Sequence, residues 1–190
     1  MIDFDTVHVI DNIIPFSYQE AIRTRLFARD FGWGYVHSVA SLRSTHPTPA
    51  AVKPLFTKDA GGLREFDFLE PIIYMAADKI GYNIKEVLQA RTFLHFPLNS
   101  KIRPPHDSIH RDFPDDHLVI LYYVNDSDGP TLLFPNKNVN SSMSQFIDDR
   151  NPSHSVEPKQ GRVVIFNGQR LHCSTAPVKG MRCIINFDVR

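Results

Sequence analysis

Beyond residue 86 the sequence consists of short apolar runs separated by turn-forming residues, and none of these runs has the spacing of a helix. One break, Asn125 to Pro130, has a composition typical of a turn. Two helical patterns precede this region. Helices followed by several strands without intervening helices predict an α+β fold, an antiparallel double-layered barrel or sandwich. Strands are expected over 86–96, 117–125, 131–134, 161–168 and 181–189.

The region before residue 86 is expected to support this barrel. A capping-box pattern at 17–20 predicts a helix that runs to about residue 29 or 30. A second helix is expected over 66–79, with Pro71 tolerated in its first turn and Gly81 at its end. Two further strands are predicted, over 7–12 and 32–37.

Two long segments are predicted to be loops. The segment 41–58 contains three prolines and shows no clear period. The segment 135–158 is polar and poor in strand-forming residues. We interpret it as an excursion over the mouth of a pocket, with one short strand around Val139. Long loops in compact domains are often functional lids.

Length and composition favour a single domain over residues 1–190, with 1–85 as support and 86–190 as the barrel core. A chain of 190 residues with 42% hydrophobic residues can bury one sizeable core. Its 21 basic and 21 acidic residues give zero net charge, which argues against a protein built mainly to bind nucleic acid. Nucleic acid is therefore not expected as a partner, and oligomeric state is not predicted.

Other features bear on cellular location. No stretch approaches the roughly 18 apolar residues of a membrane span, and residues 1–5 lack the pattern of a signal peptide. The only two cysteines, Cys173 and Cys183, are interpreted as reduced thiols. These features predict a cytoplasmic protein that does not act at a membrane.

The run from 181 to 189 alternates between two kinds of residue. In a strand, one face would carry Arg182, Ile184, Asn186 and Asp188, and the other would be continuously apolar. The apolar face should pack against other elements. The Arg182 face would point to solvent in an open sheet, but into the lumen in a barrel, where a buried guanidinium needs an anion.

His110, Asp112 and His172 form the most specific constellation of the chain. A His-x-Asp triplet alone is expected roughly once by chance here, so its setting carries the argument. Residues i and i+2 project from the same face of a strand, which would let His110 and Asp112 point at one ion. Two histidines and one carboxylate are the facial triad that binds iron(II) and leaves positions open. The alternative is a set of unrelated surface histidines.

This order and spacing resembles the Fe(II)/2-oxoglutarate-dependent oxygenases, in particular their prolyl 4-hydroxylase-like branch. His172 follows Asp112 by 60 residues (172 − 112) and Arg182 follows His172 by 10 (182 − 172). The Tyr-Tyr-aliphatic-Asn run at 122–125 strengthens the resemblance, which covers about residue 90 onward. Compact sequences with a similar run at 110–116 occur in phages of marine bacteria.

The resemblance implies a double-stranded β-helix, or jelly-roll barrel, with two helices on its larger sheet. It also implies an enzyme with iron(II) and 2-oxoglutarate as cofactors and dioxygen as co-substrate, which hydroxylates a C–H bond. The favoured substrate is peptidyl proline; free amino acids and other small molecules stay open.

The resemblance further assigns cofactor-binding roles to four residues. Arg182 would bind the C5 carboxylate of 2-oxoglutarate in bidentate geometry. Tyr123 would donate its hydroxyl to the same group, while Tyr122 packs outward. Thr131 and Asn186 are candidates for lining the cofactor pocket. Each could instead be an ordinary core or surface residue, since packing is the commoner role of a strand tyrosine.

Two rival functions stay open. The first is a nucleic-acid demethylase of the same fold, which typically carries a second Arg six residues after the cofactor Arg. Position 188 is Asp in this chain. The second is a cupin-like metal-binding module without oxidase activity. Cupins usually add a glutamate ligand, and no Glu lies between Glu86 and Glu157.

The remaining histidines receive no role. His106, His117 and His154 lie in or beside predicted loops and are expected to be solvated. A zinc site from His106 and His110 on one helix face is disfavoured by the two prolines that precede it. Arg91, Phe93 and His95 share one face of the 86–96 strand, without an assigned function.

Overall fold

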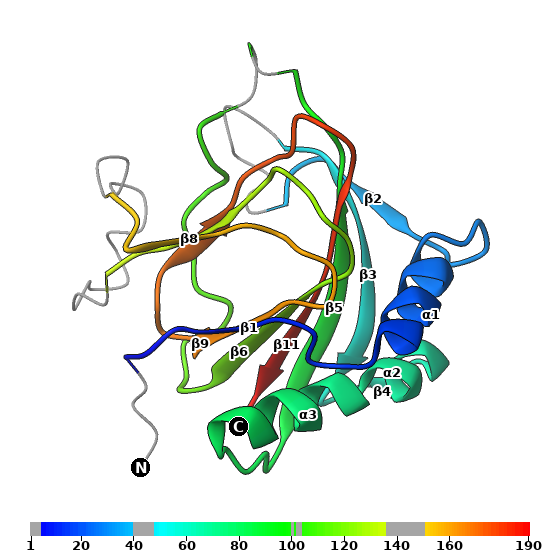
Figure 1. Cartoon of the computed structure of the whole chain (residues 1–190), viewed down its shortest axis with the longest axis vertical. Helices are drawn as coiled ribbons and strands as arrows, with labels where there is room; N and C mark the ends of the chain where they lie inside the picture. The colour runs from blue at the N-terminus through cyan, green and yellow to red at the C-terminus, as the bar shows by residue number, and fades with distance from the viewer. Residues whose placement is uncertain (1–4, 40–47, 100, 102–103, 136–150) are drawn as a thin grey trace.

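Two antiparallel sheets form the body of the computed structural model, which describes residues 5–39, 48–99, 101, 104–135 and 151–190. The eight-stranded sheet has the order β1-β9-β6-β11-β5-β3-β2, with β4 paired to β3, and the three-stranded sheet has the order β10-β7-β8. Figure 1 shows the smaller sheet lying across the barrel from the larger one. The strands are β1 (His8–Ile10), β2 (Gly34–Val36), β3 (Ala50–Thr57), β4 (Gly61–Gly62), β5 (Val87–His95), β6 (Leu118–Tyr123), β7 (Thr131–Leu133), β8 (His154–Val156), β9 (Val163–Asn167), β10 (His172–Ser174) and β11 (Arg182–Val189).

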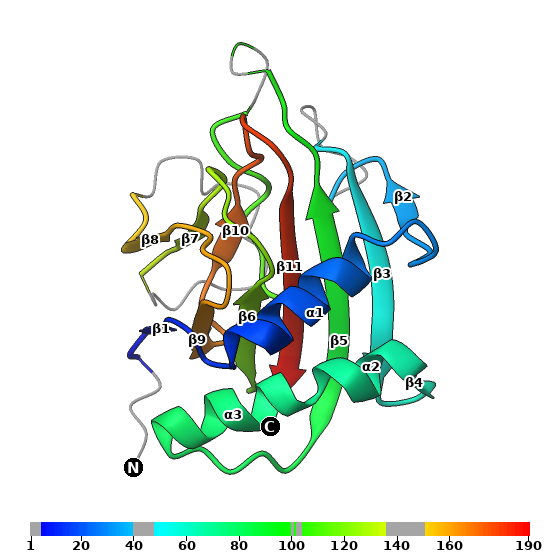
Figure 2. The same ribbon diagram turned by 45° about the vertical axis from the view of Figure 1, so that its right-hand side comes forward.

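Three helices, α1 (Phe16–Leu26), α2 (Arg64–Leu69) and α3 (Pro71–Ile80), support the larger sheet. Figure 2 shows α1 and α3 lying across its outer face. Ile22, Leu26, Ile72 and Ile73 are fully buried in one apolar cluster with residues of the sheet. The predicted architecture, strands in two layers with helices on one of them, is confirmed.

Strand β6 is buried along its whole length because both of its faces are covered. Leu118, Ile120 and Tyr122 belong to the cluster on the helix side. Val119, Leu121 and Tyr123 belong to a second apolar cluster, shared with residues of β7, β8 and β9. The expected outward packing of Tyr122 is thus confirmed, and a strand buried on both faces explains why this segment reads as a continuous apolar run.

Strand β11 lies in the middle of the larger sheet, between β5 and β6. The alternation expected from the sequence is confirmed. Cys183, Ile185, Phe187 and Val189 pack on the helix side, and Arg182 on the opposite face has no exposed surface. The barrel therefore brings a charged side chain into its interior instead of leaving it in solvent.

The prediction of a loop over 41–58 is wrong for its second half. Residues 41–47 lie outside the described residues, but 50–57 form β3, which pairs with both β2 and β5. Pro54 lies at an irregularity in the β3–β5 register, between Pro54 and Phe56. A bulge is one of the places where a strand tolerates proline, which has no N–H to donate.

Both helix predictions need correction at their ends. Helix α1 begins at Phe16 with Pro15 as its N-cap and no side-chain cap, so the capping box does not form, and the helix ends at Leu26. The second predicted helix is two helices, because Pro71 starts α3 at its first position, where a missing N–H costs nothing. Gly81 ends α3 in the left-handed region, as predicted.

The segment 135–158 contains a strand that was not expected where it lies. Strand β8 pairs with β7 and completes the smaller sheet, whereas the predicted strand around Val139 lies outside the described residues.

The N-terminal strands β1 and β3 pair with β9 and β5 of the barrel, and the division at residue 85 stays a prediction. Among the described helices, none has the length and apolar content needed to cross a membrane.

Candidate metal and cofactor site

His110, Asp112 and His172 meet at one end of the smaller sheet. Each offers one ligand atom, and these three atoms lie within 4.8 Å of one another. His172 is the first residue of β10, and His110 joins it through a single antiparallel bridge, with N···O distances of 2.9 and 3.0 Å. Asp112 lies outside any strand. The expected grouping is therefore correct, but the regular strand expected over His110 and Asp112 does not form.

The two imidazole rings have one nitrogen each turned toward a backbone carbonyl. His110 Nδ1 lies 2.9 Å from the Ser108 oxygen, and His172 Nδ1 lies 3.1 Å from the Arg170 oxygen. A proton on Nδ1 that is held in this way leaves Nε2 free as a ligand. Burial lowers the pKa of His110 to about 4, so this ring is neutral at neutral pH, the state that coordinates metals.

The Asp112 carboxylate is held from two sides. Arg91 donates to Oδ1 over 2.6 Å, and Asn186 donates to Oδ2 over 3.2 Å. Burial opposes the charge of Asp112, but the hydrogen bond and charge of His172 and the charge of Arg91 lower its pKa overall. Burial likewise opposes a charge on His172, whose pKa Asp112 raises. The carboxylate is thus ionised and oriented.

Asn186 was expected to line the cofactor pocket, and it does line the same cavity as the triad. Its side-chain amide donates to Asp112, at the triad end of the cavity and not at the Arg182 end. Arg91 was not assigned a role from the sequence, although its place on the Phe93 and His95 face of β5 was visible there. Its pairing with a residue 21 positions away could not be deduced from that pattern.

Arg182, Thr131 and Tyr123 form the second polar group of the cavity. Arg182 Nη2 donates to Thr131 Oγ1 over 2.8 Å, and the Tyr123 hydroxyl donates to the same oxygen over 2.7 Å. The guanidinium also lies 5.7 Å from the centre of the Tyr123 ring. Arg182 Nε and Nη1 are buried, and within the described part of the chain they have no hydrogen-bond partner. A fully buried guanidinium with unpaired N–H groups calls for an acceptor from a bound ligand.

Both polar groups line one cavity of about 250 Å³. The triad residues and Asn186 line it together with Thr131 and Arg182; Arg91, Phe93, His95 and Arg111 complete this part of the wall. Tyr123 does not line the cavity itself but contacts Thr131 and Arg182, which do. The structure thus brings together all seven residues predicted to form the site.

His95 and His117 are both buried, which was not predicted from the sequence. His95 lies opposite Arg182 in the β5–β11 register, and burial and the charge of Arg182 hold its pKa well below the usual value. His117 was expected to be solvated, which is wrong. It is buried 3.5 Å from Asp188, and its ring fills the space where a side chain at Gly168 would lie. Of the other two, His154 is exposed and His106 is half-buried.

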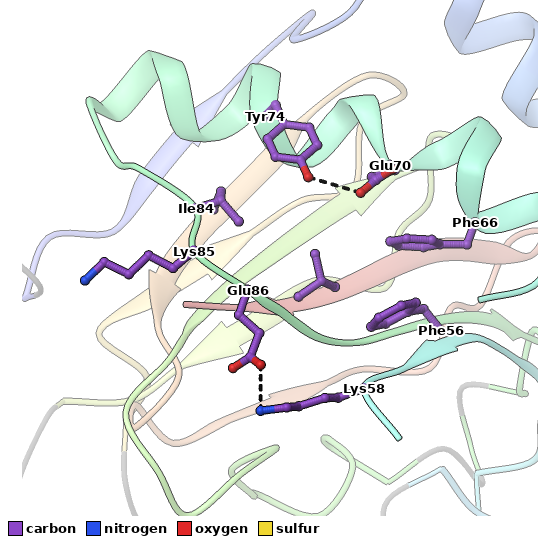
Figure 3. Close-up of a pocket in the computed structure, with 9 residues that line it drawn as sticks. Phe56, Lys58, Phe66, Glu70, Tyr74, Ile84, Lys85 and Glu86 are labelled. Atoms are coloured by element: carbon purple, nitrogen blue, oxygen red, sulfur yellow. Dashed lines mark hydrogen bonds and ion pairs between the residues drawn. The ribbon is translucent and has the colours of Figure 1, made fainter. Parts of the chain in front are cut away.

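A separate cavity of about 320 Å³ lies on the helix side of the molecule. Figure 3 shows the stacked rings of Phe56 and Phe66 on one side and the Lys58–Glu86 ion pair on another. No residue of the triad or of the Arg182 group lines it. Its two lysines and two glutamates, Lys58, Lys85, Glu70 and Glu86, sum to zero formal charge, and no histidine that could serve as a metal ligand is among the described residues that line it.

No protein-family model matches this chain, and no curated protein matches it in sequence. Solved structures do match. A prolyl-4-hydroxylase from Pseudomonas putida is 14% identical with a TM-score of 0.63, over 97% of this chain and 92% of that one. An oxidoreductase of the 2OG-Fe(II) oxygenase family from Burkholderia pseudomallei is 12% identical with a TM-score of 0.67, over 96% and 84%.

A third match carries ligands. The epimerase SnoN in complex with Fe³⁺, α-ketoglutarate and a nogalamycin compound is 14% identical with a TM-score of 0.64, over 98% of this chain and 79% of that one. At these identities the likeness establishes the fold. The chain has the double-stranded β-helix fold of the 2-oxoglutarate-Fe(II) oxygenases, and the predicted fold class is confirmed.

Proposed function

We propose that this protein is an iron(II)- and 2-oxoglutarate-dependent dioxygenase that hydroxylates a C–H bond. The observation that carries the proposal is that one cavity contains both a two-histidine, one-carboxylate cluster and a buried Arg182 with two unpaired nitrogens. The first suits iron(II), and the second suits a carboxylate. The fold, which is that of known 2-oxoglutarate-Fe(II) oxygenases, supports the same function.

The donor set fits the metal. Two imidazole nitrogens and one carboxylate oxygen are the ligands of the facial triad, which leaves positions open for a cofactor and dioxygen. His110, Asp112 and His172 would hold the ion. When bound, iron(II) and 2-oxoglutarate supply an oxidative decarboxylation of the cofactor that is coupled to hydroxylation of the substrate.

The residues around Asp112 would keep the ligand set in order. Arg91 and Asn186 hold the two carboxylate oxygens, and the backbone bridge between His110 and His172 fixes the spacing of the two rings. Partners that orient metal ligands typically change metal affinity by about 10–100-fold when removed. We therefore assign Asn186 and Arg91 to positioning of Asp112.

Arg182 would bind the distal carboxylate of 2-oxoglutarate through its unpaired Nη1. Thr131 already accepts from Nη2 and from the Tyr123 hydroxyl, which fixes the guanidinium plane. Burial disfavours the charge of Arg182 and lowers its pKa, so a bound carboxylate would relieve a desolvated cation. In this arrangement Tyr123 and Thr131 orient Arg182.

Among substrates, peptidyl proline is the first to be tested, because two of the structurally similar proteins are prolyl hydroxylases. We also propose that the protein works in a reducing, cytoplasmic compartment, since its two cysteines are free and buried. Zero net charge supports a substrate other than nucleic acid.

The proposed function is tested by binding first and by turnover second. Titration of the protein with iron(II) without oxygen, or with manganese(II), should give one site, and Asp112→Ala should weaken it strongly. Unchanged metal binding in Asp112→Ala would dismiss the triad. Oxygen-dependent formation of succinate by the iron-loaded protein, lost in His172→Ala, would support a dioxygenase. Bound metal and cofactor without succinate under any condition would leave a binding module.

A further inference from the structure

Three guanidinium groups and one carboxylate line the cavity of the proposed site, those of Arg91, Arg111, Arg182 and Asp112. Such an excess of positive charge in a partly buried cavity attracts anions. The proposed metal, iron(II), and the proposed cofactor, the dianion of 2-oxoglutarate, carry equal and opposite charges. Their binding would therefore leave the net positive charge of the cavity unchanged. The question is which of the three cations retains no partner when metal and cofactor are bound.

Two of the three are accounted for. Arg91 donates to Asp112 over 2.6 Å and lies 3.8 Å from the Asp188 carboxylate. Its guanidinium also lies 5.5 Å from the centre of the Phe93 ring. Arg182 is directed to the distal carboxylate of the cofactor. Each of these two guanidinium groups therefore has an anionic partner, in the protein or in the proposed cofactor.

Arg111 is different. It lies between two triad residues in sequence and lines the same cavity. Its buried Nε has no hydrogen-bond partner among the residues that the structure describes. No described carboxylate lies within ion-pair distance of its guanidinium, and its side chain is only half-buried. A guanidinium that is partly desolvated without a partner is costly unless a ligand supplies the acceptor.

We infer that Arg111 binds a carboxylate of the substrate, so that the substrate of this enzyme is a small molecule or chain end with a free carboxylate near the oxidised carbon. A carboxylate suits the planar fork of arginine. The cavity of about 250 Å³ is smaller than the roughly 300–1,000 Å³ typical of drug-sized ligands, and 2-oxoglutarate must share it. The proposal rests on the proposed function, and it narrows the prolyl class to substrates that present their own carboxylate.

The test uses manganese(II) as a paramagnetic stand-in for iron(II), with 2-oxoglutarate at saturation. Binding of manganese and of 2-oxoglutarate is measured first, in the wild type and in every variant; failure there would count against the proposed function and not against Arg111. The probes are matched pairs: proline and prolinamide, N-acetylproline and its amide, and a peptide with proline at its C-terminal end or in its interior. Manganese-induced broadening of the probe NMR signals reports binding close to the metal.

We expect the carboxylate member of at least one pair to bind at least about tenfold more tightly than its neutral partner, because a charge-assisted hydrogen bond is lost in the latter. Arg111→Gln should abolish this preference and leave manganese and 2-oxoglutarate binding intact. Arg111→Lys should retain part of it, since the charge remains but the fork is lost. Arg29→Gln, which removes an exposed arginine, is the matched control and should behave as wild type.

Three results would overturn the inference. The first is wild-type protein that binds manganese and 2-oxoglutarate but shows no preference for the carboxylate member of any pair, including the pair of peptides with C-terminal and interior proline. The second is a preference that survives Arg111→Gln. The third is stronger competition by phosphate or sulfate esters than by carboxylates, which would assign the cation to a different anion.

Discussion

The two faces of β11 differ sharply in the residues that they bury. On one face Cys183, Ile185, Phe187 and Val189 pack against the helix-covered core. On the other, Arg182, Asn186 and Asp188 carry polar groups into the barrel, where several of their atoms lack partners. One strand thus contributes packing on one side and, on the other, buried polar groups that cost stability unless a ligand satisfies them. Stability and binding should therefore respond separately to substitutions on the two faces.

The largest effect is expected on the packed face. Phe187 is fully buried in the helix-side cluster, and Phe187→Ala should lower the free energy of unfolding by about 3–5 kcal/mol. Chemical denaturation measures this, with the exposed Phe16→Ala as the control that should change stability little. Equal losses in the two variants would mean that this face of β11 does not hold the core.

Asp188 tests the cost of the polar face through pH. Burial, with the nearby charge of Asp112, raises its pKa to about 7, well above the roughly 3.9 of an unfolded chain. The folded state therefore retains this proton longer, and the contribution of Asp188 to stability should fall as pH rises from about 4 to 7 and level off above that.

Asp188→Asn should remove this component, so unfolding measured at several pH values should show a smaller loss between pH 4 and 7 than in the wild type. The expected size is about 1.4 kcal/mol for each pKa unit of the shift. Asp30→Asn, at a largely exposed carboxylate, is the control. A pH profile that Asp188→Asn leaves unchanged would contradict a raised pKa.

Arg182 should separate binding from stability. Arg182→Met removes the charge and keeps an apolar stem, so 2-oxoglutarate binding should weaken by well over tenfold, since a charge-assisted pair contributes about 1.5–3 kcal/mol. The free energy of unfolding without cofactor should stay the same or rise, because a desolvated cation is gone. Calorimetry with 2-oxoglutarate and denaturation of the same variant measure both. Normal cofactor binding would favour the cupin-like rival.

Asn186 lies on the same face and should act on the metal. Asn186→Ala removes the hydrogen bond to Asp112, and metal affinity should fall by about 10–100-fold. Competition titration with a chelator measures the change. The comparison with Arg182→Met is the informative one: if both variants lose metal and cofactor equally, the cavity does not have two separable ends.

The smallest effect is expected at Tyr123. Tyr123→Phe deletes one neutral hydrogen bond to Thr131, worth about 0.5–1.5 kcal/mol, so 2-oxoglutarate affinity should fall less than in Arg182→Met. Tyr122→Phe on the helix side of the same strand is the control and should leave the affinity unchanged. A loss in Tyr123→Phe as large as that in Arg182→Met would assign Tyr123 a direct contact with the cofactor.

The elements that the sequence predicted well are those whose signal is local. The 181–189 alternation, the end of α3 at Gly81 and the strand over 86–96 each follow from periodicity or a single residue's conformational preference. Strand β3 was missed for the opposite reason. Its prolines suggest a loop, and only pairing with β2 and β5 makes the segment a strand.

The candidate site residues could be chosen from the sequence by itself, because the types and order of His110, Asp112, His172 and Arg182 limit the chemistry they can support. Their surroundings were decided by the tertiary structure alone. The Arg91–Asp112 pair and the burial of His117 beside Asp188 join residues that are far apart in the chain. The local sequence pattern does not predict such contacts, because they depend on how the two sheets close around the cavity. That closure also determines which charged groups have a partner and which, like Arg111 Nε, have none among the described residues.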